Sequence, residues 1–272
     1  MVPDNYLVVG AGRMGGALLA GWLNDSVSGV IPEHLFIIDP HMGEDAKAAI
    51  DAGATEITAS HKAMGTIDVV LLAIKPQAFG DIGPVIAENL PQGALVISIL
   101  AGTTIDALTK AFPNQHIIRA MPNTPAAVGA GMTAFTCTQK VTERQARTAE
   151  RLLKAGGRVQ EVDTENMIDV VTAVSGSGPA YVFHMVEALE AAAIESGLPA
   201  DIAPEFARQT IVGAGALLGG TDATASELRV AVTSPNGTTQ AALDVLMPEL
   251  PSIMRKTVSA ALKRAKELAK SS

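Results

Sequence analysis

The sequence has one cysteine, few aromatic residues and few basic residues. Because Cys137 is the only cysteine in 272 residues, an intrachain disulfide and a cysteine-based metal site are excluded. The net charge of −8 leaves no basic stripe for a nucleic acid. No apolar run reaches the ~18 residues of a membrane span. We therefore expect no metal site and no nucleic-acid or membrane partner.

We expect no secretory signal at the start of the chain. It contains Asp4 and no basic segment, and a strand-like apolar run begins at Tyr6. We therefore expect a cytoplasmic protein. Cys137 lies in the apolar stretch Met132–Thr138, where a free thiol usually packs as a small hydrophobe, so we expect a buried bystander rather than a reactive thiol.

The first half alternates apolar runs with helix-like segments. The runs are rich in Val, Ile and Leu without polar alternation, which is typical of buried parallel strands. The predicted strands are Tyr6–Gly10, Leu35–Asp39, Val69–Ile74, Ala94–Ile99, His116–Ala120, Met132–Thr136 and Arg158–Val162. The predicted helices are Arg13–Leu23, Pro76–Asn89, Thr104–Ala111 and Thr142–Ala155. This alternation predicts a doubly wound α/β sheet.

The strand pattern stops after Val162, and amphipathic segments rich in Ala and Leu follow. The predicted helices there are Glu165–Val174, Pro179–Ser196, Asp201–Gly215, Thr224–Val232, Gly237–Leu246 and Glu249–Lys270. Prolines separate several of them and lie near predicted helix starts, where proline is tolerated. We therefore predict two domains, residues 1–162 with a parallel sheet and residues 163–272 with helices alone.

A G-x-G-x-x-G motif from Gly10 to Gly15 follows the first strand and opens the first helix. In this context the glycines allow a tight turn, close approach to a pyrophosphate and close packing of the helix on the strand. The motif predicts dinucleotide binding at a helix N-terminus. The alternative is a tight turn in a flavodoxin-like fold.

Two charged residues follow other predicted strands. Asp39 would accept a hydrogen bond from the ribose 2′-OH and repel a 2′-phosphate, and the nearest downstream basic residue is Lys47. Asp39 lies further from the glycines than the usual ~20 residues, which fits a surface insertion, Asn24–Pro32. We therefore expect NADH to be used at least as well as NADPH, although Asp39 and Lys75 would also fit as solvated charges at strand ends.

Three further strings identify a family. They are Arg119–Pro125, Ser175–Tyr181 and Ser234–Thr239, with the sequences RAMPNTP, SGSGPAY and SPNGTT. Together with the glycine-rich turn, Ala73–Pro76 and Ile99–Gly102, they resemble pyrroline-5-carboxylate reductases from about residue 6 to residue 268.

The resemblance implies an N-terminal Rossmann domain and a C-terminal all-helical domain that forms at least a dimer, with a site between the domains that a partner subunit completes. It implies reduction of 1-pyrroline-5-carboxylate to L-proline by NADPH or NADH. The expected cofactor contacts, with Asp39 and the whole glycine-rich turn included, are Val9, Gly10, Ala11, Gly12, Arg13, Met14, Gly15, Asp39, Ala73, Ile74, Lys75, Pro76, Ile99, Leu100, Ala101, Met121 and Asn123. The expected substrate contacts are Glu165, Val232, Ser234, Gly237, Thr238 and Thr239.

Thr239 is the expected catalytic residue, since in the family its equivalent bonds the ring nitrogen of the substrate. The N–H groups of Gly237, Thr238 and Thr239 would face the substrate carboxylate at a helix N-terminus. The alternative is an ordinary helix cap, where Ser and Thr are common. Asn236 replaces a glycine of the family, and asparagine tolerates positive φ, so we expect the loop to keep its shape.

The sequence leaves other functions open. A 6-phosphogluconate or β-hydroxyacid dehydrogenase would need a lysine on the long helix as acid or base, but none lies between Lys154 and Lys256. A reductase of another cyclic imine stays open, because ring size depends on the shape of the pocket. A nucleotide sensor without catalysis also stays open, although the Ser234–Thr239 loop would then have no task.

Overall fold

The computed structural model describes residues 4–24 and 28–270 and divides the chain into two compact units. The first unit runs to Gly176 and also contains the residues from Ala261 onward; the second is Ser177–Ala260. This division differs from the predicted boundary after residue 162, because the helix that begins at Glu165 packs on the sheet of the first unit. Of the predicted insertion Asn24–Pro32, residues 25–27 lie outside the described part.

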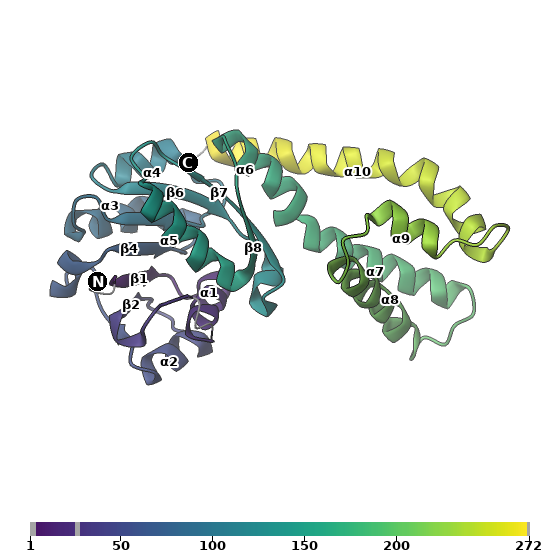
Figure 1. Cartoon of the computed structure of the whole chain (residues 1–272), viewed down its shortest axis with the longest axis horizontal. Coiled ribbons are helices and arrows are strands. Elements are labelled where there is room, and N and C mark those ends of the chain that lie inside the picture. Colours follow the sequence, from purple (N-terminus) through teal and green to yellow (C-terminus); the bar gives the residue numbers. More distant parts are fainter. Residues whose placement is uncertain (1–3, 25–27, 271–272) are drawn as a thin grey trace. The chain divides into compact units, whose positions relative to one another are not determined.

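The first unit contains an eight-stranded sheet in the order β3-β2-β1-β4-β5-β6-β7-β8 (Figure 1). The strands are β1 (Tyr6–Val9), β2 (Leu35–Ile38), β3 (Thr55–Glu56), β4 (Val69–Leu72), β5 (Leu95–Ser98), β6 (His116–Met121), β7 (Gly131–Cys137) and β8 (Gly157–Glu161). Neighbouring strands are parallel except for β6 and β7. Because the chain leaves β1 for one side of the sheet and later returns to the other, the switch point lies between β1 and β4.

Helices cover both faces of this sheet, as the doubly wound prediction requires. They are α1 (Arg13–Asn24), α2 (Glu44–Asp51), α3 (Phe79–Asn89), α4 (Ile105–Ala111), α5 (Glu143–Leu153) and α6 (Glu165–Val171). Apolar residues of α1, α2 and α5 pack on one face with Val8, and those of α3 and α4 pack on the other with Leu7. Short 3-10 turns are η1 (Pro32–His34), η2 (Lys62–Thr66), η3 (Pro76–Ala78), η4 (Thr124–Val128) and η5 (Lys154–Gly156), and η6 (Thr172–Gly176) is a π-helical turn.

The sheet corrects the prediction in two ways. First, β7 runs antiparallel to β6, because the short connection between them holds only the turn η4 and no crossover helix. Second, β8 is an edge strand and is largely exposed, so it is not a buried strand. Neither β3 nor α2 was predicted. Both have a weak apolar pattern, because the two residues of β3 are exposed and α2 buries only Ala46 and Ala49.

The second unit is built from helices. They are α7 (Gly178–Glu195), α8 (Ala203–Gly219), α9 (Ala225–Ala231) and α10 (Thr238–Lys270), whose end belongs to the first unit. The predicted break before Glu249 is wrong: α10 is continuous through Pro248 and Pro251. The carbonyl groups that these prolines leave unbonded belong to Asp244 and Met247, which are exposed to water.

No helix in the described part of the chain combines the length and the apolar character that crossing a membrane requires.

Candidate functional site

The glycine-rich turn lies at the switch point of the sheet and is fixed by steric limits. Gly10 has φ +89°, and a Cβ there would lie 2.8 Å from the carbonyl carbon of Ala73. A Cβ on Gly15 would overlap the Gly10 oxygen, so the helix lies directly against the turn. At Gly12, by contrast, a Cβ would meet no described atom within 4 Å. The turn therefore has two packing glycines and one that leaves open space in front of the helix.

The N-terminus of α1 is open to an anion. The first turn of this helix contains no acidic residue. Arg13 is exposed and has no hydrogen-bond or ion-pair partner among the residues described. The free N–H groups and the dipole of a helix start favour a negative charge. The helix carries no acidic side chain of its own in this turn, which fits a phosphate-bearing ligand.

Asp39 is held beside this turn by the backbone. Its Oδ2 accepts a hydrogen bond from the Ala11 N–H, and its Oδ1 accepts one from the His41 N–H, both at 2.6 Å. The carboxylate is therefore fixed rather than freely solvated. Glu44 and Asp45 at the start of α2 add negative charge nearby, and a Cβ on Gly16 would lie 2.8 Å from Asp45 Oδ2. This arrangement suits a ribose hydroxyl better than a 2′-phosphate.

The ends of β4 and β5 continue this edge of the sheet. The Ala73 N–H donates to Val9 O at 2.8 Å, and the Ile99 N–H donates to Leu72 O at 3.0 Å. Beyond β4, Lys75 is exposed and forms no ion pair with any described residue. The predicted contacts Ile74, Pro76, Leu100 and Ala101 lie in these same loops. Most of the predicted cofactor residues thus lie at the carboxyl ends of β1, β2, β4 and β5.

Asn123, after β6, uses its side chain within the protein. Its Oδ1 accepts from the Met132 N–H at 2.8 Å, and its Nδ2 donates to Ser175 O at 3.1 Å. The amide therefore ties the connection after β6 to β7 and to the π-helical turn. Met121 lies close to the same turn, because a Cβ on Gly176 would be 3.1 Å from its Cε.

Glu165 lies in a buried ion cluster that the sequence analysis missed. Arg119 of β6 has only 3% of its side chain exposed and donates to Glu165 Oε1 at 2.6 Å and to Asp169 Oδ1 at 3.2 Å. The three residues line a cavity of about 400 Å³ together with Lys266. The arginine within a predicted buried strand could have indicated this cluster, since a buried charge needs a partner of opposite charge.

The loop before α10 belongs to the second unit and has the shape expected of it. Asn236 has φ 58° and is the only non-glycine residue with positive φ in the described part of the chain. The Gly237 N–H donates to Ser234 O at 3.0 Å, so the prediction that this group is free for a carboxylate is wrong. The N–H groups of Thr238 and Thr239 have no partner among the described residues, and Thr239 is half-buried. Val232, which precedes the loop, is exposed.

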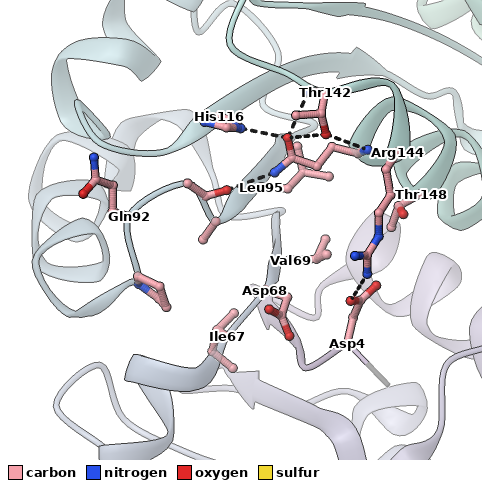
Figure 2. Close-up of a pocket in the computed structure, with 14 residues that line it drawn as sticks. Asp4, Ile67, Asp68, Val69, Gln92, Leu95, His116, Thr142, Arg144 and Thr148 are labelled. Carbon is pink, nitrogen blue, oxygen red and sulfur yellow. Dashed lines mark hydrogen bonds and ion pairs between the residues drawn. The ribbon is translucent and has the colours of Figure 1, made fainter. Parts of the chain in front are cut away.

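A further cavity, of about 270 Å³, lies at the amino ends of β4, β5 and β6. Figure 2 shows the residues that line it. Arg144 pairs with Asp4 at 2.8 Å, and the Gln145 side chain joins His116 to the Gly93 carbonyl. None of the predicted site residues lines this cavity. Ligands of doubly wound sheets bind at the carboxyl ends of the strands, so we give it no part in the candidate site.

Comparison with known proteins gives consistent matches over the whole chain. A family model described as pyrroline-5-carboxylate reductase dimerisation matches residues 165–268, and one described as NADP oxidoreductase, coenzyme F420-dependent, matches residues 6–102. A pyrroline-5-carboxylate reductase of Synechocystis is 39% identical over 97% of both chains.

Solved structures agree. A pyrroline-5-carboxylate reductase from Coxiella burnetii has a TM-score of 0.89 at 32% identity, covering 98% of this chain and 99% of the other. A pyrroline carboxylate reductase from Plasmodium falciparum with NADP bound has a TM-score of 0.81 at 26% identity and covers 99% of both chains. The chain belongs to the pyrroline-5-carboxylate reductase family.

Proposed function

We propose that this chain is an NAD(P)H-dependent reductase that converts 1-pyrroline-5-carboxylate to L-proline, the last step of proline biosynthesis. One observation carries the proposal: the match to the Synechocystis reductase extends over 97% of the chain and so includes both the glycine-rich turn and the Ser234–Thr239 loop. A nucleotide-binding protein without catalysis would need only the first of these features.

The turn fits the pyrophosphate of a dinucleotide. Space is open in front of Gly12, whereas Gly10 and Gly15 are needed for packing, and the start of α1 offers N–H groups and Arg13. We propose all seventeen predicted residues of the first unit as cofactor contacts. The Asn123 side chain forms its hydrogen bonds within the protein, so it would hold the connection after β6 in place beside the cofactor. When bound, the reduced nicotinamide supplies a hydride to the carbon of the C=N bond.

Asp39 favours NADH in this proposal. Its fixed carboxylate would accept a hydrogen bond from the ribose 2′-OH, and it would repel the 2′-phosphate of NADPH. We therefore propose that NADH is used at least as well as NADPH, although the Plasmodium falciparum relative has NADP bound.

The Ser234–Thr239 loop would bind the substrate. The free N–H groups of Thr238 and Thr239 at the start of α10 suit a carboxylate, and the hydroxyl of Ser234 adds a donor. We propose that the Thr239 hydroxyl bonds and orients the ring nitrogen. A hydroxyl is a poor acid, but a protonated imine already carries its proton, which remains on nitrogen in the product. Val232, which precedes the loop, completes the proposed substrate contacts of the second unit.

The second unit favours self-association. In the part of the chain that the structure describes, no residue of α7 is buried, and α8 buries only Ala203 and Ala207. Large apolar side chains are exposed on these helices and on α10, among them Phe183, Phe206, Val212, Leu217 and Val245. Such a surface usually marks an interface, and the matched family model describes dimerisation. We propose a homo-oligomer, at least a dimer, in the cytoplasm.

The test is an assay of cofactor oxidation. Purified protein is mixed with 1-pyrroline-5-carboxylate, and the loss of reduced nicotinamide absorbance is followed with NADH and with NADPH in parallel. We expect turnover with both, with NADH at least as fast. Folded protein that binds nucleotide but turns over neither cofactor would contradict the proposal, and would favour another cyclic imine or a sensing role.

A further inference from the structure

The ion cluster beneath α6 connects distant parts of the chain. Arg119 lies in the middle of β6, on the same face of the sheet as Ile117, which α3 and α4 cover. Its guanidinium bonds two carboxylates, those of Glu165 and Asp169, which are one turn apart on α6. A buried charge is costly unless it is paired, so the three side chains form one structural unit.

Glu165 makes one contact that Asp169 does not. Its Oε1 accepts the Ile105 N–H at 2.7 Å as well as the Arg119 guanidinium at 2.6 Å. Ile105 is the first residue of α4, and Thr104 caps the same helix by accepting the Ala107 N–H. The cluster therefore holds the end of the loop between β5 and α4, residues 99–104.

The same loop carries three of the proposed cofactor contacts, Ile99, Leu100 and Ala101. It is fixed at its start by the bond from Ile99 to β4, and Gly102 in its middle has φ +79°. Its other end depends on Glu165 and, through Glu165, on Arg119. A small displacement of a positioning element is enough to weaken binding and turnover strongly.

We infer that Arg119 and Glu165 are positioning residues for the cofactor loop, and that Glu165 is not a substrate ligand. The inference rests on the proposed function, because it assumes that the loop contacts the nicotinamide cofactor. It replaces the substrate role that the resemblance implies for Glu165. Glu165 Oε1 accepts two hydrogen bonds within the protein, from Ile105 and from Arg119, and these bonds hold the side chain against the end of the loop.

The test compares three variants of the full-length chain: Glu165→Ala, Glu165→Gln and Asp169→Asn. The dissociation constant for NADH is measured by fluorescence titration without imine, and Tm is measured in parallel. Glu165→Ala should raise the constant ~10-fold or more, since it leaves the Ile105 N–H unpaired and removes one of the two carboxylates that pair with Arg119. Glu165→Gln should have a smaller effect, because its amide oxygen still accepts the Ile105 N–H.

Asp169→Asn is the matched control, because it weakens the pairing of the same guanidinium without contacting the loop. It should lower Tm about as much as Glu165→Gln while keeping the NADH constant within about twofold of wild type. Parallel losses of Tm and of NADH affinity in all three variants would overturn the inference, since Glu165 would then only stabilise the fold.

The Michaelis constant for the imine provides the second arm. If Glu165→Ala raised this constant and left the NADH dissociation constant unchanged, Glu165 would be a substrate ligand and the inference would be wrong. Because the NADH titration needs no turnover, wild-type protein that binds NADH without reducing the imine would contradict the proposed function alone.

Discussion

Replacing Asp39 by asparagine should shift the cofactor preference toward NADPH. The Asp39 carboxylate lies at the carboxyl end of β2 and is held by the N–H groups of Ala11 and His41 at 2.6 Å. These bonds keep the charge beside the turn where the proposal has the adenosine ribose. Asparagine keeps the length of the side chain and one acceptor oxygen but removes the charge.

The two cofactors should respond in opposite directions. A hydrogen bond from the 2′-OH to a carboxylate contributes about 1 kcal/mol more than one to a neutral oxygen, so NADH should lose roughly fivefold in kcat/KM. At about 5 Å and an effective dielectric constant of about 20, two unit charges repel by about 3 kcal/mol, which salt reduces. If half of this repulsion, about 1.5 kcal/mol, is relieved, kcat/KM for NADPH should rise roughly 12-fold, and the NADPH/NADH ratio of kcat/KM should rise by a factor on the order of 60.

The assay measures initial rates with NADH and NADPH at saturating imine for wild type, Asp39→Asn and Asp45→Asn. Asp45 is a suitable control because it carries the same charge near the start of α1 but forms no hydrogen bond with the turn in the described structure. Its variant should keep the ratio within about threefold of wild type. An unchanged ratio in Asp39→Asn would refute the reasoning, and equal shifts in both variants would attribute the preference to net charge.

Three further predictions concern other parts of the chain. Gly15→Ala should lower Tm by several degrees because its Cβ would overlap backbone, whereas Gly12→Ala should weaken NADH binding with little change in Tm; equal Tm losses would contradict this. Thr239→Ala should lower kcat ~10-fold or more with the fold intact, and Thr239→Ser should restore part of it; full activity of the alanine variant would exclude the assignment. Burial, helped by Glu161, raises the pKa of the Cys137 thiol to about 12, so a disulfide reagent should label it rapidly at pH 8 only after unfolding, and rapid labelling of the folded protein would be the contrary result.

The sheet was predictable from the sequence because its central strands are buried on both faces. Such strands are continuous apolar runs, and those beginning at Tyr6, Val69 and Ala94 matched β1, β4 and β5 to within two residues at each end. The glycine-rich turn was equally clear, since the contacts at Gly10 and Gly15 allow no side chain. The prediction that Asn236 keeps the loop in a positive-φ conformation is also confirmed.

The direction of the strands and the contacts between residues far apart in the sequence could not be predicted in the same way. An apolar run carries no direction, so β7 was assigned parallel although the short connection after β6 excludes a crossover helix. The prolines were interpreted as separating helices and lying near helix starts, yet α10 continues through Pro248 and Pro251, where its surface is exposed. The contact between Arg119 and Glu165 joins residues 46 positions apart, and no local pattern encodes it.

The transfer of a labelled hydride tests the central claim most directly. Protein is incubated with 1-pyrroline-5-carboxylate and NADH that carries deuterium at C4 on the transferred face, and the product is analysed by mass spectrometry. We predict L-proline with one deuterium on the ring carbon that was doubly bonded to nitrogen. Oxidation of NADH without labelled proline, or no reaction in folded protein that binds NADH, would contradict the account.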